Sequence, residues 1–138
     1  MLLPLSDIHD LYTQSDFIAV TCPLTPVTKQ MISFNEFSLM KKTAYIINIA
    51  RGGIINDKAL IDALDHHQIF GVALDVFTHE PLEKDHPYFK YDNVFLSPHI
   101  SGNFPEYQTD MIQQFIDHLI CFLNGKALKN RICKKRLY

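Results

Sequence analysis

The feature that most constrains this sequence is the regular alternation of short apolar runs with amphipathic segments. Four apolar runs are rich in β-branched and aromatic residues, and each is bounded by polar residues, Gly or Pro; they cover residues 16–22, 44–49, 69–75 and 93–97. Such runs are typical of strands buried on both faces. Strands that alternate with helices form βαβ units with parallel strands. The sequence therefore predicts an α/β fold around a parallel sheet.

Helix signals lie between and around these runs. Short helices are predicted over residues 6–14, 33–40 and 56–65, each beginning at a capping residue, namely Ser6, Ser33 and Asn56. A longer helix is predicted from Pro105 to Gly125, because apolar residues recur there at helical spacing and form a wide stripe. The expected architecture is thus a small parallel sheet followed by one long C-terminal helix.

Composition narrows the classes of partner. A chain of 138 residues has the size of one domain. Its formal net charge of −2 provides no basic field for nucleic acid or an anionic membrane, so a small-molecule partner is expected. No apolar run approaches the roughly 18 residues that span a bilayer, and the N-terminus lacks the pattern of a signal peptide, so the sequence predicts a cytoplasmic protein.

Cysteine and histidine spacing gives no sign of a metal site. The three cysteines, Cys22, Cys121 and Cys133, are an odd number without C-x-x-C spacing, which argues against a disulfide framework and a zinc ribbon. The pairs 66–67 (HH) and 79–80 (HE) lack an H-E-x-x-H pattern or a convergent set of ligands. We therefore expect reduced thiols and no metal.

Four polar residues follow the predicted strands at their carboxyl ends: Arg51, Asp75, Glu80 and His99. In an open α/β sheet this edge is where ligands bind. Arg51 could grip a carboxylate through two parallel hydrogen bonds. His99 could donate a proton with Glu80 orienting its ring, while a nicotinamide cofactor carries a hydride. The set suits the reduction of a carbonyl beside a carboxylate.

Each of these residues also has a plainer interpretation when taken alone. An Arg or a His after a strand is more often a solvated surface residue than a catalytic one. Asp75 at a strand end is more often a turn former or a helix cap. Cys22 is more often a small buried apolar residue than a reactive thiol.

The sequence segments around these residues favour the functional interpretation over the plainer one. Four linked segments occur in order: residues 22–28 (CPLTPVT), 40–53 (MKKTAYIINIARGG), 71–77 (GVALDVF) with 80–82 (EPL), and 93–102 (NVFLSPHISG). Together they resemble the NAD-binding domain of the D-isomer-specific 2-hydroxyacid dehydrogenases. Four motifs in the same order are far more specific than any one of them.

The resemblance implies a role for each matching residue. Arg51 would bind the carboxylate and carbonyl of a 2-oxo or 2-hydroxy acid, Glu80 would support the histidine, and His99 would be the general acid/base. NAD is the implied cofactor, with NADP not excluded, and Asp75 would hold the nicotinamide carboxamide. The implied cofactor-binding residues are Cys22, Pro23, Thr28, Ile49, Ala50, Arg51, Asp75, His99 and Gly102.

The sequence also departs from the family pattern. Its five glycines, at positions 52, 53, 71, 102 and 125, form no G-x-G-x-x-G turn for a pyrophosphate. We therefore expect the second, nicotinamide-side half of a doubly wound Rossmann-like sheet. The expected parts are a partial NAD-binding domain over residues 1–103, a connecting helix over 104–124, and a tail over 125–138 that would return to a substrate domain.

Two consequences remain open at the level of sequence. The strand at residues 16–22 would lack a neighbour on one side, so we expect a homo-oligomer or association through that exposed sheet edge. The chain is then either a dehydrogenase of this family represented by half of its cofactor domain, or a non-catalytic remnant or nucleotide-sensing interaction module.

Overall fold

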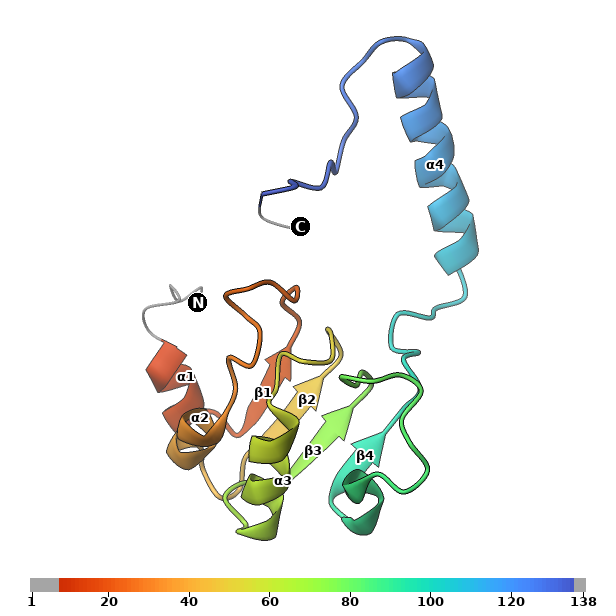
Figure 1. Cartoon of the computed structure of the whole chain (residues 1–138). Helices are drawn as coiled ribbons and strands as arrows, with labels where there is room; N and C mark the ends of the chain where they lie inside the picture. The colour runs from red at the N-terminus through yellow and green to blue at the C-terminus, as the bar shows by residue number, and fades with distance from the viewer. Residues whose placement is uncertain (1–7, 136–138) are drawn as a thin grey trace. The chain divides into compact units, whose positions relative to one another are not determined.

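The computed structural model describes residues 8–135 and divides the chain into two compact units, Met1–Ser101 and Gly102–Tyr138. The first unit is built on a four-stranded sheet of order β1-β2-β3-β4 (Figure 1). The strands are β1 (Phe17–Val20), β2 (Tyr45–Asn48), β3 (Gly71–Leu74) and β4 (Val94–Leu96), and every neighbouring pair is parallel. The predicted α/β fold with a parallel sheet is confirmed.

The helices of the first unit are α1 (Ile8–Gln14), α2 (Phe34–Leu39) and α3 (Asp57–Asp65). The predicted caps are present at α2 and α3: the Ser33 N–H donates to Glu36 Oε2 at 2.9 Å, and Asn56 Oδ1 accepts from the Ala59 N–H at 3.1 Å. The expected cap at Ser6 lies outside the described residues. A short 3-10 helix, η2 (Pro87–Lys90), was not predicted.

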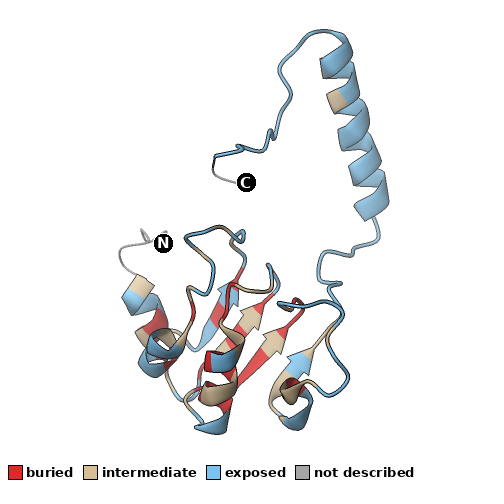
Figure 2. Cartoon of the chain, in the orientation of Figure 1, coloured by how far each residue is buried: buried red, intermediate tan, exposed pale blue. Residues whose placement is uncertain are grey.

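One face of the sheet forms the core. Residues on this face alternate along the strands with residues on the other, as the period of a strand requires. Ile18, Ile46 and Val72 lie in register across β1, β2 and β3 and are at most 5% exposed (Figure 2). They pack in one apolar cluster with buried side chains of the three helices, including Phe37 and Leu60, so α1–α3 cover this face.

The opposite face, which we call the open face, carries Phe17, Ala19, Tyr45, Ile47, Ala73 and Phe95. Phe17 is 69% exposed and Phe95 is 62% exposed. The rings of Phe17 and Tyr45 stack at 5.8 Å between centroids, and the ring of Tyr45 lies 5.0 Å from that of Phe70. Within the described part of the first unit, no helix covers this face and no strand pairs with the outer edge of β1. The sheet is thus half of a doubly wound arrangement.

The second unit contains the long helix α4 (Tyr107–Leu123). Gly125 ends it with φ +64°: its N–H donates to the Phe122 carbonyl, and the Lys126 N–H donates to the Cys121 carbonyl. Pro105 lies just before the helix rather than in its first turn. None of the helix residues is buried. Its apolar stripe is therefore exposed along its whole length and consists of Met111, Ile112, Phe115, Ile116, Leu119, Ile120 and Leu123.

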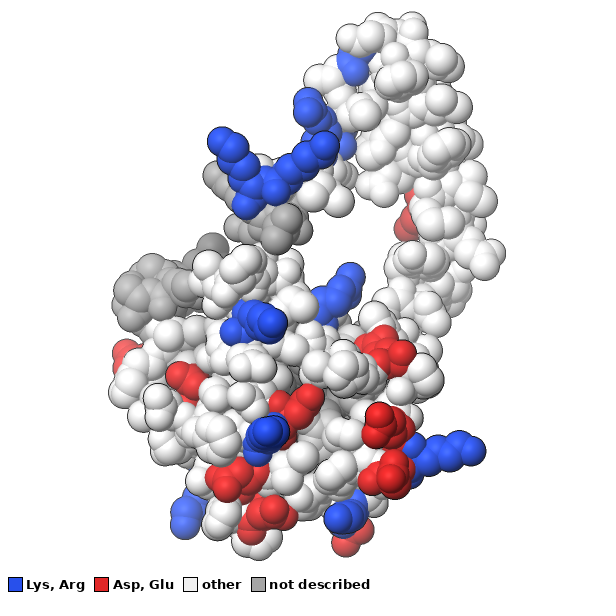
Figure 3. Space-filling model, viewed as in Figure 1, with Lys and Arg blue, Asp and Glu red and all other residues white. Residues whose placement is uncertain are grey.

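Charged side chains are mixed in sign on the first unit. In the view of Figure 3, Lys and Arg alternate with Asp and Glu over its surface, without a continuous patch of one sign. Among the described residues, no helix combines the length and apolar composition needed to span a bilayer.

Candidate active site

The carboxyl ends of β2, β3 and β4 lead into the loops that carry most of the predicted site residues. The Asp75 N–H donates to the Asn48 carbonyl at 3.0 Å, and the Ser97 N–H donates to the Leu74 carbonyl at 3.0 Å. The strand ladder therefore continues one residue beyond β3 and β4. This continuation fixes where Asp75 and Ser97 leave the sheet.

The Arg51 loop is held by a buried asparagine. Asn48, 2% exposed, accepts a hydrogen bond from the Ala50 N–H and donates one to the Arg51 carbonyl, both at 3.1 Å. The side-chain amide of Asn48 thus closes a tight turn after β2, and both its oxygen and its nitrogen have a hydrogen-bond partner although the residue is buried. Arg51 is exposed, and its guanidinium donates to the Ala50 carbonyl at 2.6 Å. Arg51 makes no hydrogen bond to Asp75, Glu80 or His99 in the described residues.

Gly52 brings the Arg51 loop against the segment that carries Glu80. A Cβ atom at Gly52 would lie 1.9 Å from the Phe77 carbonyl oxygen and 2.6 Å from the Thr78 nitrogen. Only a residue without a side chain permits this approach of two backbones. Gly52 is therefore needed to place the loops after β2 and β3 side by side.

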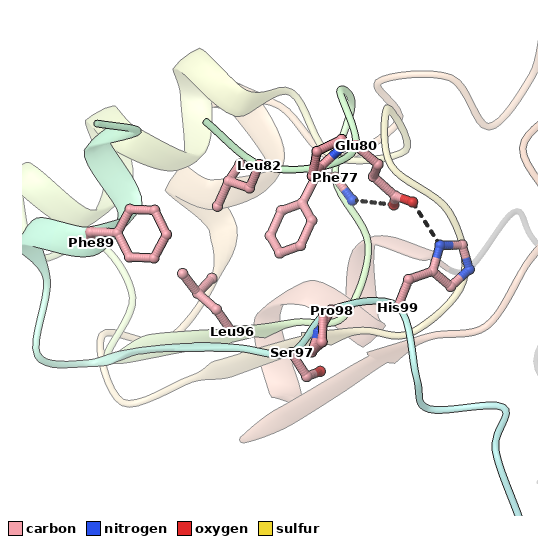
Figure 4. Close-up of a pocket in the computed structure, with 9 residues that line it drawn as sticks. Phe77, Glu80, Leu82, Phe89, Leu96, Ser97, Pro98 and His99 are labelled. Carbon is pink, nitrogen blue, oxygen red and sulfur yellow. Dashed lines mark hydrogen bonds and ion pairs between the residues drawn. The ribbon is translucent and has the colours of Figure 1, made fainter. Parts of the chain in front are cut away.

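Glu80 and His99 form a pair (Figure 4). Glu80 Oε2 lies 2.8 Å from His99 Nδ1, and Glu80 Oε1 accepts from the Phe77 N–H at 2.9 Å. The hydrogen bond with His99 and the one from Phe77 outweigh desolvation and lower the pKa of Glu80. An ionised carboxylate only accepts hydrogen bonds, so Nδ1 of His99 carries a proton and donates a hydrogen bond to Glu80. The other ring nitrogen, Nε2, is then the atom that exchanges a proton with a ligand.

A cavity of about 600 Å³ lies on one side of this pair. Its walls are mostly apolar side chains, and Glu80 and His99 line one end; the apolar members are Phe77, Pro81, Leu82, Phe89, Leu96 and Pro98. In Figure 4 the second nitrogen of the His99 ring points away from the side chains of Phe77 and Phe89. The cavity therefore lies behind the pair, on the side opposite the atom that would exchange a proton.

Asp75 is the most enclosed acidic residue of the site, at 3% exposed. Its Oδ1 accepts from Ser97 Oγ at 2.5 Å and from the Ile100 N–H at 2.9 Å, and its Oδ2 accepts from the Ser101 N–H at 2.8 Å. Burial raises the pKa of Asp75, but hydrogen bonds from the side chains of Ser101 and Ser97 and from the Ile100 and Ser101 N–H groups lower it more, so the net pKa lies well below the usual aspartate value. Asp75 is therefore ionised and bound to the loop that contains His99.

The remaining predicted cofactor residues fall into three places. Ile49 shares a small cavity of about 140 Å³ with Asp75, Ser97 and Ser101 at the carboxyl edge of the sheet, while the neighbouring Ala50 is buried. Gly102 is exposed and belongs to the second unit, so nothing places it against the pair.

Cys22, Pro23 and Thr28 lie in the loop after β1. Thr28 Oγ1 donates to the Pro23 carbonyl at 2.6 Å and accepts from the Thr25 N–H at 2.7 Å. These bonds fold the loop into a compact turn. The described residues show no hydrogen bond between this turn and the His99–Glu80 pair. The structure thus pairs Glu80 with His99 and binds Asp75 to the loop that contains His99, whereas the turn is not joined to them.

Sequence reasoning missed two residues that hold the site. Asn48 is the polar amide residue in the apolar run 44–49, and Ser97 is the last residue of the apolar run 93–97. A buried polar group needs partners, so both positions carried a signal that the loops after these strands would be tied to them. The described residues contain no group of three or more His, Cys, Asp or Glu side chains that could hold a metal ion.

Known proteins with similar sequences identify the family of this chain. Residues 2–101 match the family model described as "D-isomer specific 2-hydroxyacid dehydrogenase, NAD binding domain". The chain belongs to this dehydrogenase family. It is 41% identical over 129 residues to a glyoxylate reductase of Thermofilum pendens, and 40% identical over 129 residues to a glyoxylate/hydroxypyruvate reductase B of Cronobacter sakazakii.

A solved structure supports the same assignment. A D-isomer specific 2-hydroxyacid dehydrogenase from Xanthobacter autotrophicus Py2, in complex with NADPH and MES, superposes with a TM-score of 0.90 at 28% identity. The match covers 97% of this chain and 55% of that one. The two reductases are covered over 38% and 40% of their length, against 91% and 94% of this chain. This member of the dehydrogenase family thus spans about two-fifths of the curated relatives that it matches.

Proposed function

We propose that this chain carries the acid–base half of a reaction in which a hydride passes between a nicotinamide cofactor and a small 2-oxo or 2-hydroxy acid. The observation that carries the proposal is the His99–Glu80 pair, with 2.8 Å between Nδ1 and Oε2 and with Nε2 directed away from the apolar cavity. The family assignment and the reductase names of the relatives support the reaction class.

The protein's own contribution to this chemistry is proton transfer and charge. In the direction of reduction, protonated His99 gives the proton on Nε2 to the carbonyl oxygen of the substrate; in the reverse direction, neutral His99 takes it from the hydroxyl. Glu80 stabilises the charged imidazole and keeps the proton on Nδ1 in place. Arg51, exposed after β2, offers a planar guanidinium for the substrate carboxylate.

The cofactor's nicotinamide end suits the residues at the carboxyl edge. The ionised carboxylate of Asp75 only accepts hydrogen bonds, so the N–H of a nicotinamide carboxamide is a donor that suits it. Ile49, Ala50 and the turn containing Cys22, Pro23 and Thr28 would line the rest of the groove, and Gly102 would close it. When bound, the nicotinamide supplies or accepts the hydride.

The organisation and partners of the chain follow from the same reasoning. We propose a partial NAD-binding domain over residues 1–103, a connecting helix over 104–124 and a tail beyond it, in a cytoplasmic protein. The open face and the unpaired edge of β1 would associate with another polypeptide, with a second copy as the first candidate.

Binding and turnover of the purified chain test the proposed function. The probe is NADH, titrated by fluorescence, and turnover is followed as NADH oxidation with glyoxylate as the 2-oxo acid. We expect saturable binding that Asp75→Ala weakens, and a loss of turnover of about 10²–10⁴-fold for His99→Ala. Arg51→Ala should raise the KM for glyoxylate and lower kcat/KM.

Matched controls are His9→Ala and Arg131→Ala, two exposed residues outside the site. Unchanged turnover in His99→Ala, against detectable activity of the parent chain, would remove His99 from the reaction. Absence of saturable NADH binding up to millimolar concentration would instead favour a non-catalytic remnant or interaction module.

A further inference from the structure

The proposed acid–base chemistry does not use the hydrogen bonds between the loop around His99 and the buried carboxylate of Asp75. Residues 97–101 form the loop that carries His99, here called the His99 loop. We propose that Asp75 is a positioning residue for His99: its carboxylate holds the His99 loop in the conformation that brings the imidazole to Glu80. This inference rests on the proposed function only in that it takes His99 to be the residue that transfers the proton.

The hydrogen bonds to Asp75 lie on both sides of His99. Ser97 Oγ donates from two residues before His99, and the Ile100 and Ser101 N–H groups donate from directly after it. The His99 N–H also donates to the Ser97 carbonyl at 3.1 Å. Because Asp75 continues the ladder of β3 and is 3% exposed, its carboxylate is a fixed point relative to the sheet. Both ends of the peptide segment that carries the imidazole are thus tied to one immobile group.

His99 needs such a tie because of its backbone conformation. Its φ is +56°, in the left-handed region that residues with a Cβ atom adopt at a cost. Such a conformation persists only where the surrounding structure determines it. The side chain itself is about half exposed and makes one hydrogen bond, to Glu80, so packing does little to fix it. Without Asp75 the φ of His99 should relax to negative values, and Nδ1 should leave Glu80.

The charge of Asp75 makes this arrangement possible. Both oxygens must accept, and only the ionised carboxyl offers acceptor sites on both without a competing proton. An ionised carboxylate oxygen can accept more than one hydrogen bond. Positioning His99 and contacting a cofactor are therefore compatible roles of the same carboxylate.

The test compares the parent chain with Asp75→Asn by NMR, without cofactor or substrate. Asparagine keeps the size of the side chain but replaces one acceptor oxygen with a donor, which faces N–H groups of the His99 loop. We expect amide exchange at Ile100 and Ser101 to accelerate by at least about tenfold, because hydrogen bonds to a charged group are lost. The ¹⁵N shifts of the His99 ring should move toward those of an unpaired imidazole, and we expect the same movement in Glu80→Gln.

Asp65→Asn is the matched control. Asp65 Oδ1 accepts from the Tyr91 hydroxyl at 2.8 Å on α3, so the same chemical change is made far along the chain from the His99 loop. This variant should leave the His99 ring signals unchanged. If Asp75→Asn fails to fold, Ser97→Ala removes one of the three donors, and Ser97→Thr should restore the parent signals by restoring the hydroxyl.

Two results would overturn the positioning role. In the first, Ile100 and Ser101 exchange faster in Asp75→Asn while the His99 ring signals stay as in the parent chain; Asp75 then holds the loop without setting the imidazole. In the second, neither exchange nor ring signals change. Both readouts are independent of activity, so a chain without dehydrogenase activity would contradict the proposed function and leave this inference standing.

Discussion

At the scale of single residues, each polar side chain that holds the site makes at least one hydrogen bond to backbone. Asn48 holds the Arg51 turn, Asp75 holds the His99 loop, and Glu80 is held by the Phe77 N–H. Each anchoring group has its partners within a few residues of a catalytic candidate. The exposed side chains of Arg51 and His99 are therefore attached to backbone segments that are held by hydrogen bonds.

The lowered pKa of Glu80 gives a pH prediction. Because the folded-state pKa lies below the ordinary value of 4.5, Glu80 stabilises the fold above that pH, and the contribution is lost as pH falls through the lowered pKa. At pH 4.5 the Glu80 carboxyl should therefore remain mostly ionised. The check is a ¹³C NMR titration of the glutamate side chains.

His99→Ala should raise the Glu80 midpoint toward the ordinary value, because the hydrogen bond with His99 is its largest cause of lowering. Asp62 of α3 pairs with His66, which follows the helix, so His66→Ala removes a His–carboxylate pair elsewhere and should leave the Glu80 midpoint unchanged. A Glu80 midpoint that is the same in the parent chain and in His99→Ala would contradict the pairing seen here.

At the scale of elements, one tight backbone approach places the loops after β2 and β3 side by side. The Gly52 approach to Phe77 has the clearest consequence for stability. Gly52→Ala should lower the free energy of unfolding by about 1–3 kcal/mol, because a Cβ atom there meets a carbonyl oxygen that belongs to backbone and must move it. Denaturant unfolding followed by circular dichroism measures the change.

Gly102→Ala is the control for this substitution. No atom lies within 4 Å of a Cβ atom built there, and the backbone is not in the left-handed region. Its stability should stay within about 0.5 kcal/mol of the parent chain. An effect of Gly52→Ala no larger than that of Gly102→Ala would contradict the close approach of Gly52 to Phe77.

The elements were largely predictable from sequence, whereas their contacts were not. Apolar runs and capping residues located the four strands and α2, α3 and α4, since these signals are local. The 3-10 helix at Pro87–Lys90 is too short to show a period. The position of Arg51, Asp75, Glu80 and His99 after strands was also evident.

The partners of Asp75 were not evident. They lie 22 to 26 residues away and are set by the register of β3 with β4, which no local pattern records. The resemblance suggested a cofactor contact for Asp75, and that role stays a prediction. Contacts of this kind depend on sheet pairing and so become visible only in the structure.

At the scale of the whole molecule, the open face predicts association. We expect the chain to form concentration-dependent dimers or larger species in sedimentation velocity experiments. Phe95→Glu places a charge on the open face and should weaken self-association by at least about tenfold, because an unpaired charge would be buried.

Val27→Glu is the matched control, since Val27 is 75% exposed and lies in the loop after β1 rather than on the open face. It should leave association unchanged. A parent chain that sediments as a monomer at every accessible concentration would contradict the prediction, as would a Phe95→Glu variant that associates like the parent.

The aromatic cluster on the open face has an optical consequence. The sequence contains six tyrosines and no tryptophan, so tyrosine emission is not lost by energy transfer to an indole. Tyr45 stands between Phe17 and Phe70 on this face. Anything that covers the face changes the surroundings of its phenol ring, and Tyr45→Phe identifies its share of the signal. The chain therefore carries a label-free reporter on the surface where its association would occur.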